Sequence, residues 1–491
     1  MDGGKGQFLP ASLLRDPRFA ARGASVALHV LVFLFCLAAS WFVWRRMGLE
    51  MFMLAVSGVF LALAYAVVSF RSLFFPFVVW VLSTGGFRYL FSIQTPLLPD
   101  LFLDRMMLVW LGLVFFVWVF ATRQKLRPPY LLDILVFSHG LYILIRVFID
   151  DMEFANPWTR SILMPYAAYF FAKNIVTDGA RVRKLLWVLL ALLVYYEVTA
   201  VAEKLELHAL IYPKLIITEA TQFRGRSVGP FLQAPLFGTI IGILLPLHLY
   251  FVATVRNSLG RALILASFGL GIAGLYFTYT RGSWLAGVAA LGVAAVLNRR
   301  HYLKVLVPAL VVAPILAIGF LGAGQDQFLK ERVENENTLG SRVATAITAL
   351  KVWRDNPILG VGFFQYRVAR EAYIEPISFP GLGTIRFIQF RHNNIHDIYL
   401  GPLAEDGLLG MSMQVGIYVI IFRTFRRKYR WRNRGDPFAT YVLPIFAGVF
   451  VGYLVGGLAI DYRFFSFVGT LFYMSAGIQE GYQAPENTHV S

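Results

Sequence analysis

The sequence has few charged residues and almost no cysteine. Only 15% of its 491 residues are charged, whereas a soluble chain carries about 25%. This shortage excludes a set of soluble domains, although the length alone would suggest about three of them. The single cysteine, Cys36, excludes an intramolecular disulfide bond and leaves the redox compartment undecided.

Nucleotide-binding motifs and internal repeats are also missing. The segments between the apolar runs contain no glycine-rich phosphate loop, dinucleotide fingerprint or kinase-like motif, which argues against an ATP-driven pump. There is no repeat of solenoid length and no low-complexity tract. The formal net charge of +17 is not gathered on one face with interleaved aromatic residues, so we do not expect nucleic-acid binding.

Hydrophobic residues make up 58% of the chain. They recur in runs of about 18 to 22 residues, long enough to cross a hydrocarbon core of about 30 Å. We therefore expect an all-α, polytopic integral membrane protein with about fourteen transmembrane helices and one large outer loop that contains amphipathic helices. The first run is too long for a signal-peptide core and lacks a clear cleavage site, so we expect it to be retained. The expected spans are 24–44, 51–69, 72–92, 104–121, 130–148, 160–177, 184–203, 231–254, 261–279, 282–297, 302–321, 398–421, 438–459 and 464–480.

The distribution of lysine and arginine predicts the orientation of these spans. With a cytoplasmic N-terminus, about half of the 45 basic residues fall in cytoplasmic segments, and seven of them lie between Arg423 and Arg434. Arg45 and Arg46 run against this trend. The scheme divides the chain into N-terminal transmembrane helices (1–203), central transmembrane helices with outer arginine motifs (204–321), a large periplasmic loop (322–397) and C-terminal transmembrane helices with a tail (398–491).

The large outer loop contains its own helical pattern. Val343, Ile347 and Leu350 recur at helical spacing within residues 341–353, with charged residues off that stripe. We expect an amphipathic helix that lies on the outer membrane surface or caps the bundle. An Asn-Pro pair and two glycines at 356–362 should end the helix and form a turn.

Four polar residues stand immediately before the next apolar helix: Arg391, His392, His396 and Asp397. Burying such groups without a purpose would be costly. The two histidines lie one turn apart if the helix begins early, which is the spacing of two zinc ligands, but no third ligand lies between them. We therefore expect no metal site. The alternative is a set of solvated loop residues in which Asp397 caps the following helix.

The string from His396 to Gly410 reads His-Asp-x-x-Leu followed by Ala-Glu-x-Gly-x-x-Gly. It resembles the core motif of the O-antigen ligase and polymerase superfamily, which ends the large periplasmic loop of those proteins. Asp397 stands where that family most often has Asn. The resemblance spans residues 220–425 and includes three further segments: RGRSVGPFLQAPLFG (224–238), TYTRGSWLAG (278–287) and SRVATAITALKVWRDNPILGVGFFQY (341–366).

The resemblance implies a glycosyltransferase of the bacterial inner (cytoplasmic) membrane, with its active site on the periplasmic side. The implied donor is an undecaprenyl-diphosphate-linked glycan, which is transferred with inversion to an acceptor hydroxyl without a cofactor. Polymerisation of O-antigen or exopolysaccharide repeats is favoured because fourteen spans fit that branch better than twelve. The alternative is ligation of the glycan to the lipid A core of lipopolysaccharide. The implied partners are the bilayer, the glycan or lipid A core acceptor, and polysaccharide export or chain-length proteins.

Within this reaction, we expect His396 to act as the general base, because an imidazole with a pKa near 6.5 accepts a proton at neutral pH. Arg224, Arg226 and Arg281 lie at the outer ends of helices, where the guanidinium fork can bind the oxygens of the diphosphate. The alternative for Arg281 is that it only reaches the membrane interface. Glu405 is nine residues, about two and a half helical turns, beyond His396, so we expect it to be structural.

Charged residues inside the spans need partners, because the bilayer offers them no water. Arg88 and Arg146 either join the basic floor of the site or pair with Glu197. His248 is expected to be a satisfied core histidine. A secondary transporter or flippase for polyprenyl-linked or anionic cargo is the competing class, but its charged groups should lie near the midplane beside repeated broken helices, whereas here they cluster at the outer edge.

Overall fold

The computed structural model describes residues 57–93, 101–123, 125–150, 152–219, 223, 225–307, 337–375, 377–379, 383–385 and 395–484. The chain forms two units, Met1–Ser72 and Leu73–Ser491. In the first unit, the described part is an apolar helix at Ser57–Arg71. The expected span at 24–44, which contains Cys36, lies outside the described residues. The division at 203, 321 and 397 stays a prediction.

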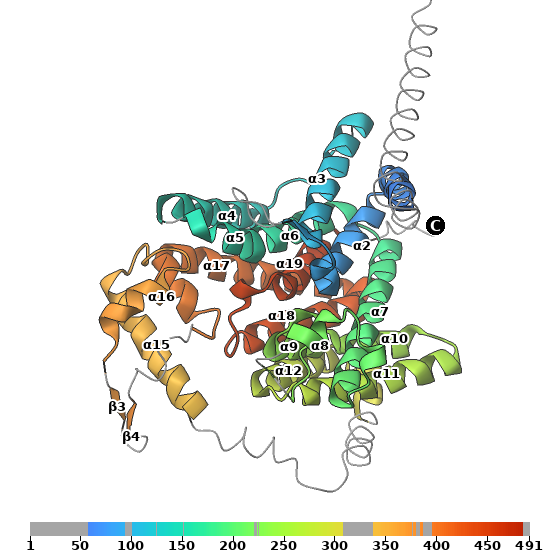
Figure 1. Cartoon of the computed structure of the whole chain (residues 1–491). Coiled ribbons are helices and arrows are strands. Elements are labelled where there is room, and N and C mark those ends of the chain that lie inside the picture. The colour runs from blue at the N-terminus through green and yellow to red at the C-terminus, as the bar shows by residue number, and fades with distance from the viewer. Residues whose placement is uncertain are drawn as a thin grey trace, which may run out of the picture. The chain divides into compact units, whose positions relative to one another are not determined.

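The second unit is built almost entirely of helices (Figure 1). Among the described residues, seven helices are long and apolar enough to cross a membrane, which confirms a helical, multi-pass membrane protein. The total of fourteen spans stays a prediction. The seven are Leu103–Thr122, Leu131–Asp150, Gly179–Lys204, Ala234–Thr254, Ser258–Phe277, Leu400–Arg434 and Phe438–Gly456.

The N-terminal half of this unit contains short irregular turns between its long helices. Its elements are α2 (Phe74–Leu82), η2 (Ser83–Phe87), η3 (Arg88–Leu90), β1 (Ser92–Ile93), β2 (Leu101–Phe102), α3 (Leu103–Thr122), α4 (Leu131–Asp150), η4 (Met152–Phe154), α5 (Ala155–Trp158), η5 (Thr159–Leu163), α6 (Met164–Ile175), α7 (Gly179–Lys204), η6 (His208–Leu210), α8 (Leu215–Glu219), η8 (Gly229–Phe231), α9 (Ala234–Leu244), α10 (Pro246–Thr254), α11 (Ser258–Phe277) and α12 (Arg281–Leu297). Strands β1 and β2 pair antiparallel.

The C-terminal half contains the outer-loop helix and the last long helices. Its elements are α15 (Asn337–Asp355), α16 (Tyr366–Ala369), η9 (Arg370–Tyr373), β3 (Ile377–Phe379), β4 (Gly383–Ile385), α17 (Leu400–Tyr429), η11 (Arg430–Arg434), η12 (Phe438–Val442), α18 (Leu443–Gly456), η13 (Tyr462–Phe464) and α19 (Ser466–Gly481). Strands β3 and β4 form a second antiparallel pair.

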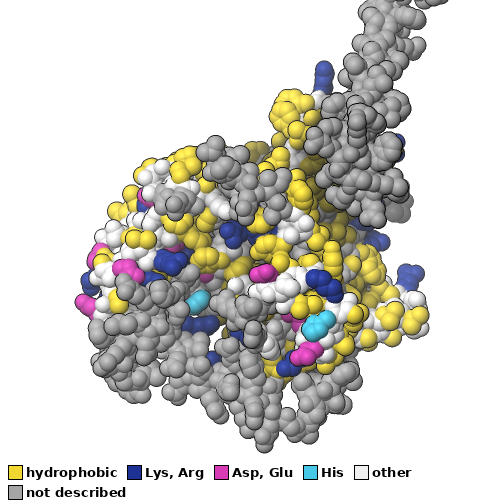
Figure 2. Space-filling view, in the orientation of Figure 1, with side chains coloured by type: hydrophobic (Ala, Val, Ile, Leu, Met, Phe, Trp, Pro, Cys, Tyr) yellow, Lys and Arg dark blue, Asp and Glu magenta, His cyan; other side chains and the backbone are white. Residues whose placement is uncertain are grey.

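Helices α7, α11, α12 and α18 pack around α9 and α10. Helix α12 packs along both α9 and α18, α11 packs along α7, and α19 packs along α6. Helix α17 packs against both α4 and α15. As a result, 89% of the apolar window in Ala234–Thr254 is buried, against 22% in α3. Helix α3 therefore has the character of a lipid-facing helix, and Figure 2 shows hydrophobic side chains over it.

The buried charges find partners, but the alternative pairing of Glu197 with an arginine is wrong. Glu197 lies 3.3 Å from His248, which is fully buried and is the core histidine expected from the sequence. Arg88 lies 4.0 Å from Asp104, and Arg146 pairs with a carboxylate one turn further along α4. Hydropathy alone does not reveal that Glu197 on α7 lies beside His248 on α10 and not beside either arginine.

One end of the helices carries 16 of the 45 lysine and arginine residues and is held together by hydrogen bonds. Arg432 donates to the carbonyl of Leu297 (2.8 Å), and Lys428 donates to the carbonyl of Tyr482 (2.7 Å). The side chain of Asn174 at the end of α6 accepts from the backbone N–H of Arg127 (3.1 Å). We call this the basic end; it comprises residues 123–130, 174–184, 297–304, 423–442 and 481–484.

The outer-loop helix is present, but its buried face differs from the expected stripe. Helix α15 ends at Asp355, immediately before the Asn-Pro pair, as the sequence predicts. However, Leu350 is 43% exposed, whereas Ala344, Thr348 and Val352 are buried. Small residues form this face because α15 packs closely against α17. Val343, Ile347 and Leu350 are therefore not the buried face of α15, and the expected position of this helix on the outer membrane surface stays a prediction.

Candidate active site

The segment that carries Arg226 is held tightly between two helices. Ser227 donates through its backbone N–H to the carbonyl of Phe277 (3.0 Å) and through its hydroxyl to the carbonyl of Ala200 (2.7 Å). The Glu203 carboxylate accepts from the next two backbone N–H groups, both at 2.9 Å. These bonds fix the backbone of residues 226–229 at the ends of α7 and α11.

Arg226 joins two of the sequence motifs. Its Nε donates to the carbonyl of Thr278 (2.9 Å), and its Nη2 donates to the hydroxyl of Thr280 (2.5 Å). Its guanidinium also lies 5.1 Å from the ring centre of Phe223. The structure therefore connects the segment after α8 to the turn between α11 and α12. Arg224 lies outside the described residues.

Arg281 begins α12 directly after that turn, and its side chain is exposed. The turn is stiffened by Trp284, whose ring stacks on Tyr276 at 5.6 Å with an interplanar angle of 8°. A Cβ atom on Gly282 would lie 2.5 Å from the Cβ of Ala459. Glycine is therefore required for the close approach of the connection between α18 and α19, which brings that connection beside Arg281.

His396 lies before α17, in a segment without regular secondary structure that has buried neighbours. Ile395 is 3% exposed, and the backbone N–H of Ile398 donates to the carbonyl of Gly457 (2.9 Å). These contacts fix the backbone on both sides of His396. Because α17 begins at Leu400, the helix does not begin early, and His396 is not on its first turn.

The condition under which His392 and His396 would lie one turn apart on this helix, an early helix start, is therefore not met. His392 and Arg391 lie outside the described residues, so the expectation that they support His396 in the site stays a prediction. Asp397 has the position expected for a cap: its Oδ1 accepts from the N–H groups of Tyr399 (2.9 Å) and Leu400 (2.5 Å). Burial raises the pKa of the Asp397 carboxyl above its ordinary value, although these two hydrogen bonds oppose the change.

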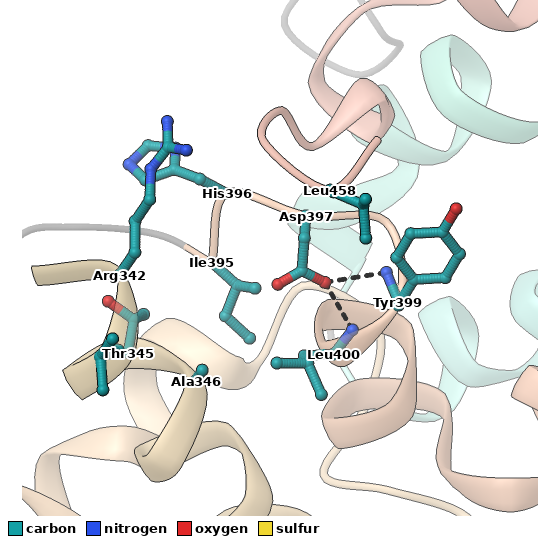
Figure 3. A pocket seen from close by; sticks show the side chains of 10 residues that line it. Arg342, Thr345, Ala346, Ile395, His396, Asp397, Tyr399, Leu400 and Leu458 are labelled. Atoms are coloured by element: carbon teal, nitrogen blue, oxygen red, sulfur yellow. Dashed lines mark hydrogen bonds between the residues drawn. The ribbon is translucent and has the colours of Figure 1, made fainter. Parts of the chain in front are cut away.

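A pocket of about 440 Å³ lies between α15 and the start of α17 (Figure 3). We call it the site pocket. Arg342 and His396 extend together on one side of it, and Asp397 points toward the first turn of α17. The residues that line it are Arg342, Val343, Thr345, Ala346, Ile395, His396, Asp397, Tyr399, Leu400 and Leu458.

The surroundings of His396 favour its neutral form. Desolvation lowers the pKa of the imidazole below its ordinary value, and the positive charge of Arg342 lowers it further. The carboxylates of Asp461 and Asp397 oppose this shift but do not reverse it. A neutral imidazole at pH 7 is the form that accepts a proton.

Arg342 is a site residue that the sequence analysis missed. Its Nη2 lies 3.4 Å from the carbonyl of Ala459, which is the same residue that approaches Gly282. Desolvation and then the positive charge of Arg281 lower the pKa of the Arg342 guanidinium, so the two arginines lie within electrostatic reach of each other. The sequence showed Arg342 only as a charged residue off the apolar stripe of a helix.

The glycine-containing segment after α15 and the glycine-containing start of α17 are joined by backbone hydrogen bonds. Four backbone hydrogen bonds of 2.8 to 3.1 Å join residues 357–362 to residues 404–409. They form where α17 is broken at Gly407, which has φ +66° and ψ −167°. A side chain at this φ would be strained, and a Cβ there would lie 2.3 Å from the carbonyl oxygen of Ile358. These hydrogen bonds hold the segment that follows α15 against the break in α17. The glycines of the two motifs are therefore spaced for a backbone contact that positions α15.

Glu405 is structural, as expected, and its partner is Arg463. Arg463 donates to the Glu405 carboxylate and, at 2.8 Å, to Asp461. Its guanidinium also lies 5.3 Å from the ring centre of Phe364. We call Arg463, Asp461 and Glu405 the Arg463 cluster. Asp461 and Arg463 are not identifiable from the sequence, because the short connection before α19 carries no recognisable motif.

Arg146 and Arg88 do not line the site pocket. Arg146 donates to the carbonyl of Leu359 (2.8 Å) and to Asp150 (2.8 Å), and so it holds the 357–362 turn. Arg88 lies near Asp104, with its guanidinium 4.4 Å from the ring centre of Phe102. The structure therefore brings together His396, Asp397 and Arg342, with Arg281 close by.

Comparison with known families agrees with this arrangement. Residues 266–415 match the family model described as O-antigen ligase. The matched segment includes Arg281, Arg342, His396 and Glu405, and the match confirms the resemblance to the O-antigen ligase and polymerase superfamily. At the level of the family, it supports membrane glycosyl transfer from a lipid-linked donor. The search of curated proteins found no match to the chain.

Proposed function

We propose that this membrane protein of the O-antigen ligase and polymerase superfamily transfers a glycan from undecaprenyl diphosphate to an acceptor hydroxyl in the site pocket. The observation that carries the proposal is the shared position of His396 and Arg342 in one cavity, with Arg281 within electrostatic reach. A base beside guanidinium groups suits a reaction that removes a proton and releases a diphosphate. The site would face the periplasm, in line with the expected topology.

The reaction needs one bond to form and one to break at the anomeric carbon. The acceptor oxygen attacks that carbon from the face opposite the diphosphate, which inverts its configuration, and the bond to the diphosphate oxygen breaks. His396 takes the proton of the acceptor hydroxyl. Undecaprenyl diphosphate leaves with the bonding electron pair.

Arg281 and Arg342 stabilise the negative charge that develops on the leaving diphosphate. Arg226 is proposed to contribute in the same way while it holds the turn that presents Arg281. The guanidinium fork supplies two parallel hydrogen bonds to phosphate oxygens, which a lysine does not. The reaction as written requires no metal ion. Arg224, Arg391 and His392 remain proposed supporting residues.

For the acceptor, we propose a second lipid-linked repeat, so that the product is a longer O-antigen or exopolysaccharide chain. This choice follows the expected total of fourteen spans. Ligation to the lipid A core is the second candidate, because the matched family model is described as O-antigen ligase. Both reactions use the same base and the same leaving group.

Purified protein in lipid nanodiscs tests the proposal directly. It is given an undecaprenyl-diphosphate-linked glycan with either more of the same lipid or lipid A core as acceptor, and undecaprenyl diphosphate and glycan products are measured. We expect release of undecaprenyl diphosphate with a lengthened lipid-linked product. A product attached only to lipid A core would establish the ligase reaction instead. Folded protein that releases no lipid diphosphate with either acceptor would disprove glycosyl transfer.

A further inference from the structure

A large apolar groove of about 880 Å³ lies between α3, α4 and α6, away from the site pocket. Helix α3 packs mainly against α2, and α4 packs mainly against α17, so the space between α3 and α4 remains open. Val109 on α3 and Phe137 on α4 line the groove and are 67% and 72% exposed. Its size lies within the range of about 300 to 1,000 Å³ that is typical of ligand pockets.

The charged residues of this groove lie at one end only. Arg127, Asp133 and Lys173 line it where α4 begins and α6 ends, which is the basic end. Lys173 and Asp133 neutralise each other at 2.6 Å, and Lys173 also donates to the carbonyl of Pro128. Of the residues that the structure describes, none forms an ion pair with Arg127 within 4.0 Å, and only its backbone N–H is bonded, to Asn174.

We propose that this groove binds an anionic phospholipid from the leaflet next to the basic end, with its phosphate at Arg127 and an acyl chain between α3 and α4. A lone guanidinium at the membrane surface attracts a phosphodiester, and an apolar groove open to the bilayer accepts a hydrocarbon chain. The bound lipid would fill the space between the two helices and stabilise their separation. This site is independent of the proposed transfer reaction.

The position of the charge distinguishes this ligand from the lipid-linked donor. If a polyprenyl diphosphate occupied the groove with its diphosphate toward the site pocket, it would need cationic groups at that end. The lining residues there, Trp158, Ile162 and Leu163, carry no charge. A phosphate at the opposite end meets Arg127, so the charge pattern favours a phospholipid with its headgroup at the basic end.

Native mass spectrometry tests the headgroup contact. The protein is reconstituted with phosphatidylglycerol or with phosphatidylethanolamine, and the lipid retained after mild detergent is counted. We expect retention of phosphatidylglycerol, reduced about five- to tenfold in Arg127→Ala, because one basic residue near the surface contributes about 1 kcal/mol. Lys125→Ala is the control, since Lys125 is exposed in the same segment but does not line the groove. Equal retention in both variants would overturn the headgroup assignment.

Filling the groove tests the acyl-chain contact. Gly112 lies on α3 in the wall of the groove, and a Cβ there would meet no atom within 4 Å. Gly112→Phe therefore occupies the space without a clash and should abolish lipid retention. Gly292→Phe is the matched control, because Gly292 lies on α12 with the same free space but outside the groove. Unchanged retention in Gly112→Phe would place the chain elsewhere and refute the proposal.

The identity of the occupant is tested by a photoreactive amino acid at position 109 in cell membranes. Mass analysis of the cross-linked product should reveal an anionic phospholipid attached at this site. Capture of a polyprenyl phosphate would assign the groove to the donor and overturn the proposal. Capture of a peptide from residues 1–72 would also overturn it, because the groove would then belong to the first unit of this chain.

Discussion

Arg463 and the two arginines at the site pocket, Arg342 and Arg281, differ in what surrounds their positive charge. In the Arg463 cluster, the guanidinium is bound by two carboxylates and its side chain is only 13% exposed. In the site pocket, Arg342 approaches a backbone carbonyl, and among the described residues neither it nor Arg281 lies within 4.0 Å of a carboxylate. The charge of Arg463 is therefore neutralised within the protein, whereas among the described residues no carboxylate within 4.0 Å neutralises Arg342 or Arg281. We expect Arg463 to determine stability and the two pocket arginines to determine turnover.

The largest effect should come from the base beside the pocket arginines. His396→Ala should lower turnover by about two to four orders of magnitude, the usual contribution of general acid–base catalysis. Donor binding should be nearly unchanged, because the imidazole meets the acceptor hydroxyl and not the diphosphate. Release of undecaprenyl diphosphate and binding of the lipid-linked donor are measured in parallel.

His392→Ala is the internal control for this variant, since the motif spacing points to His396 alone. Equal damage from the two changes would mean that the spacing assigns the wrong histidine or that both act as one unit. If neither change slows transfer by folded protein, the general-base mechanism is incorrect.

Arg463→Met tests the structural arginine of this comparison and should destabilise the protein. It leaves Asp461 and Glu405 without their cation, and losing one partner of a buried ion pair costs about 3–5 kcal/mol. Thermal unfolding in detergent should occur at a clearly lower temperature. Arg342→Met should leave unfolding nearly unchanged, since no ion pair is lost among the described residues. Similar stability in the two variants would refute the distinction between the arginine groups.

Arg226→Lys tests whether the guanidinium fork contributes to transfer. It keeps the positive charge but loses the planar pair of donors, so turnover should fall by about one to three orders of magnitude, or roughly 1.5–4 kcal/mol. Arg281→Lys gives the matched comparison, because Arg281 has the same expected target but does not hold the turn at Thr278. Full activity in both lysine variants would show that charge alone is sufficient.

A smaller effect should appear in the pH dependence of turnover. His396 must be neutral to act as a base, and its pKa lies below the ordinary value, so activity should be lost only as the pH falls below about 6.5. Arg342 contributes to this lowering; Arg342→Met should therefore raise the pKa of His396 and move the acidic limb of kcat/KM to higher pH. Arg342→Lys keeps the charge and should leave the limb in place. Coincident limbs in the wild type and Arg342→Met would contradict the electrostatic coupling.

The smallest effect should come from metal removal. Since we assign stabilisation of the diphosphate to arginines, a chelator should leave turnover intact. Turnover is measured before and after treatment with chelator, and again after addition of zinc or magnesium. Loss of activity that a metal restores would transfer this role to a cation and make the histidines of the loop candidate ligands.

The sequence predicted single elements better than the contacts between them. The expected span at 130–148 matches α4, and the outer-loop helix ends where the Asn-Pro pair predicts. Hydropathy over about 20 residues and a helix stop signal are local properties, so one sequence is enough to find them. Which face of α15 is buried depends on how closely α17 packs against it. The residues of α17 lie in another part of the chain, so the pattern within α15 alone does not predict this face.

In the candidate site, too, the sequence predicted single residues better than the contacts between them. The motif located His396 and Asp397, and the cap formed by Asp397 was one of the readings that the sequence allowed. Arg342 and Asp461 approach His396 only through the folding of the outer loop and of the connection after α18. The Glu405 carboxylate has its partner 58 positions later in the chain, and no spacing rule relates the two residues.

The pairing of residues 357–362 with the break in α17 has an evolutionary consequence. Both walls of the site pocket are attached to the same helix, one through this pairing and the other through the direct start of α17. The sequence between residues 375 and 395 therefore begins and ends at fixed points. We therefore expect a change in the length of this segment to leave both walls of the site pocket in place, because the pairing and the start of α17 lie outside it. A chain with this construction can vary in one loop while the walls of its pocket stay where they are.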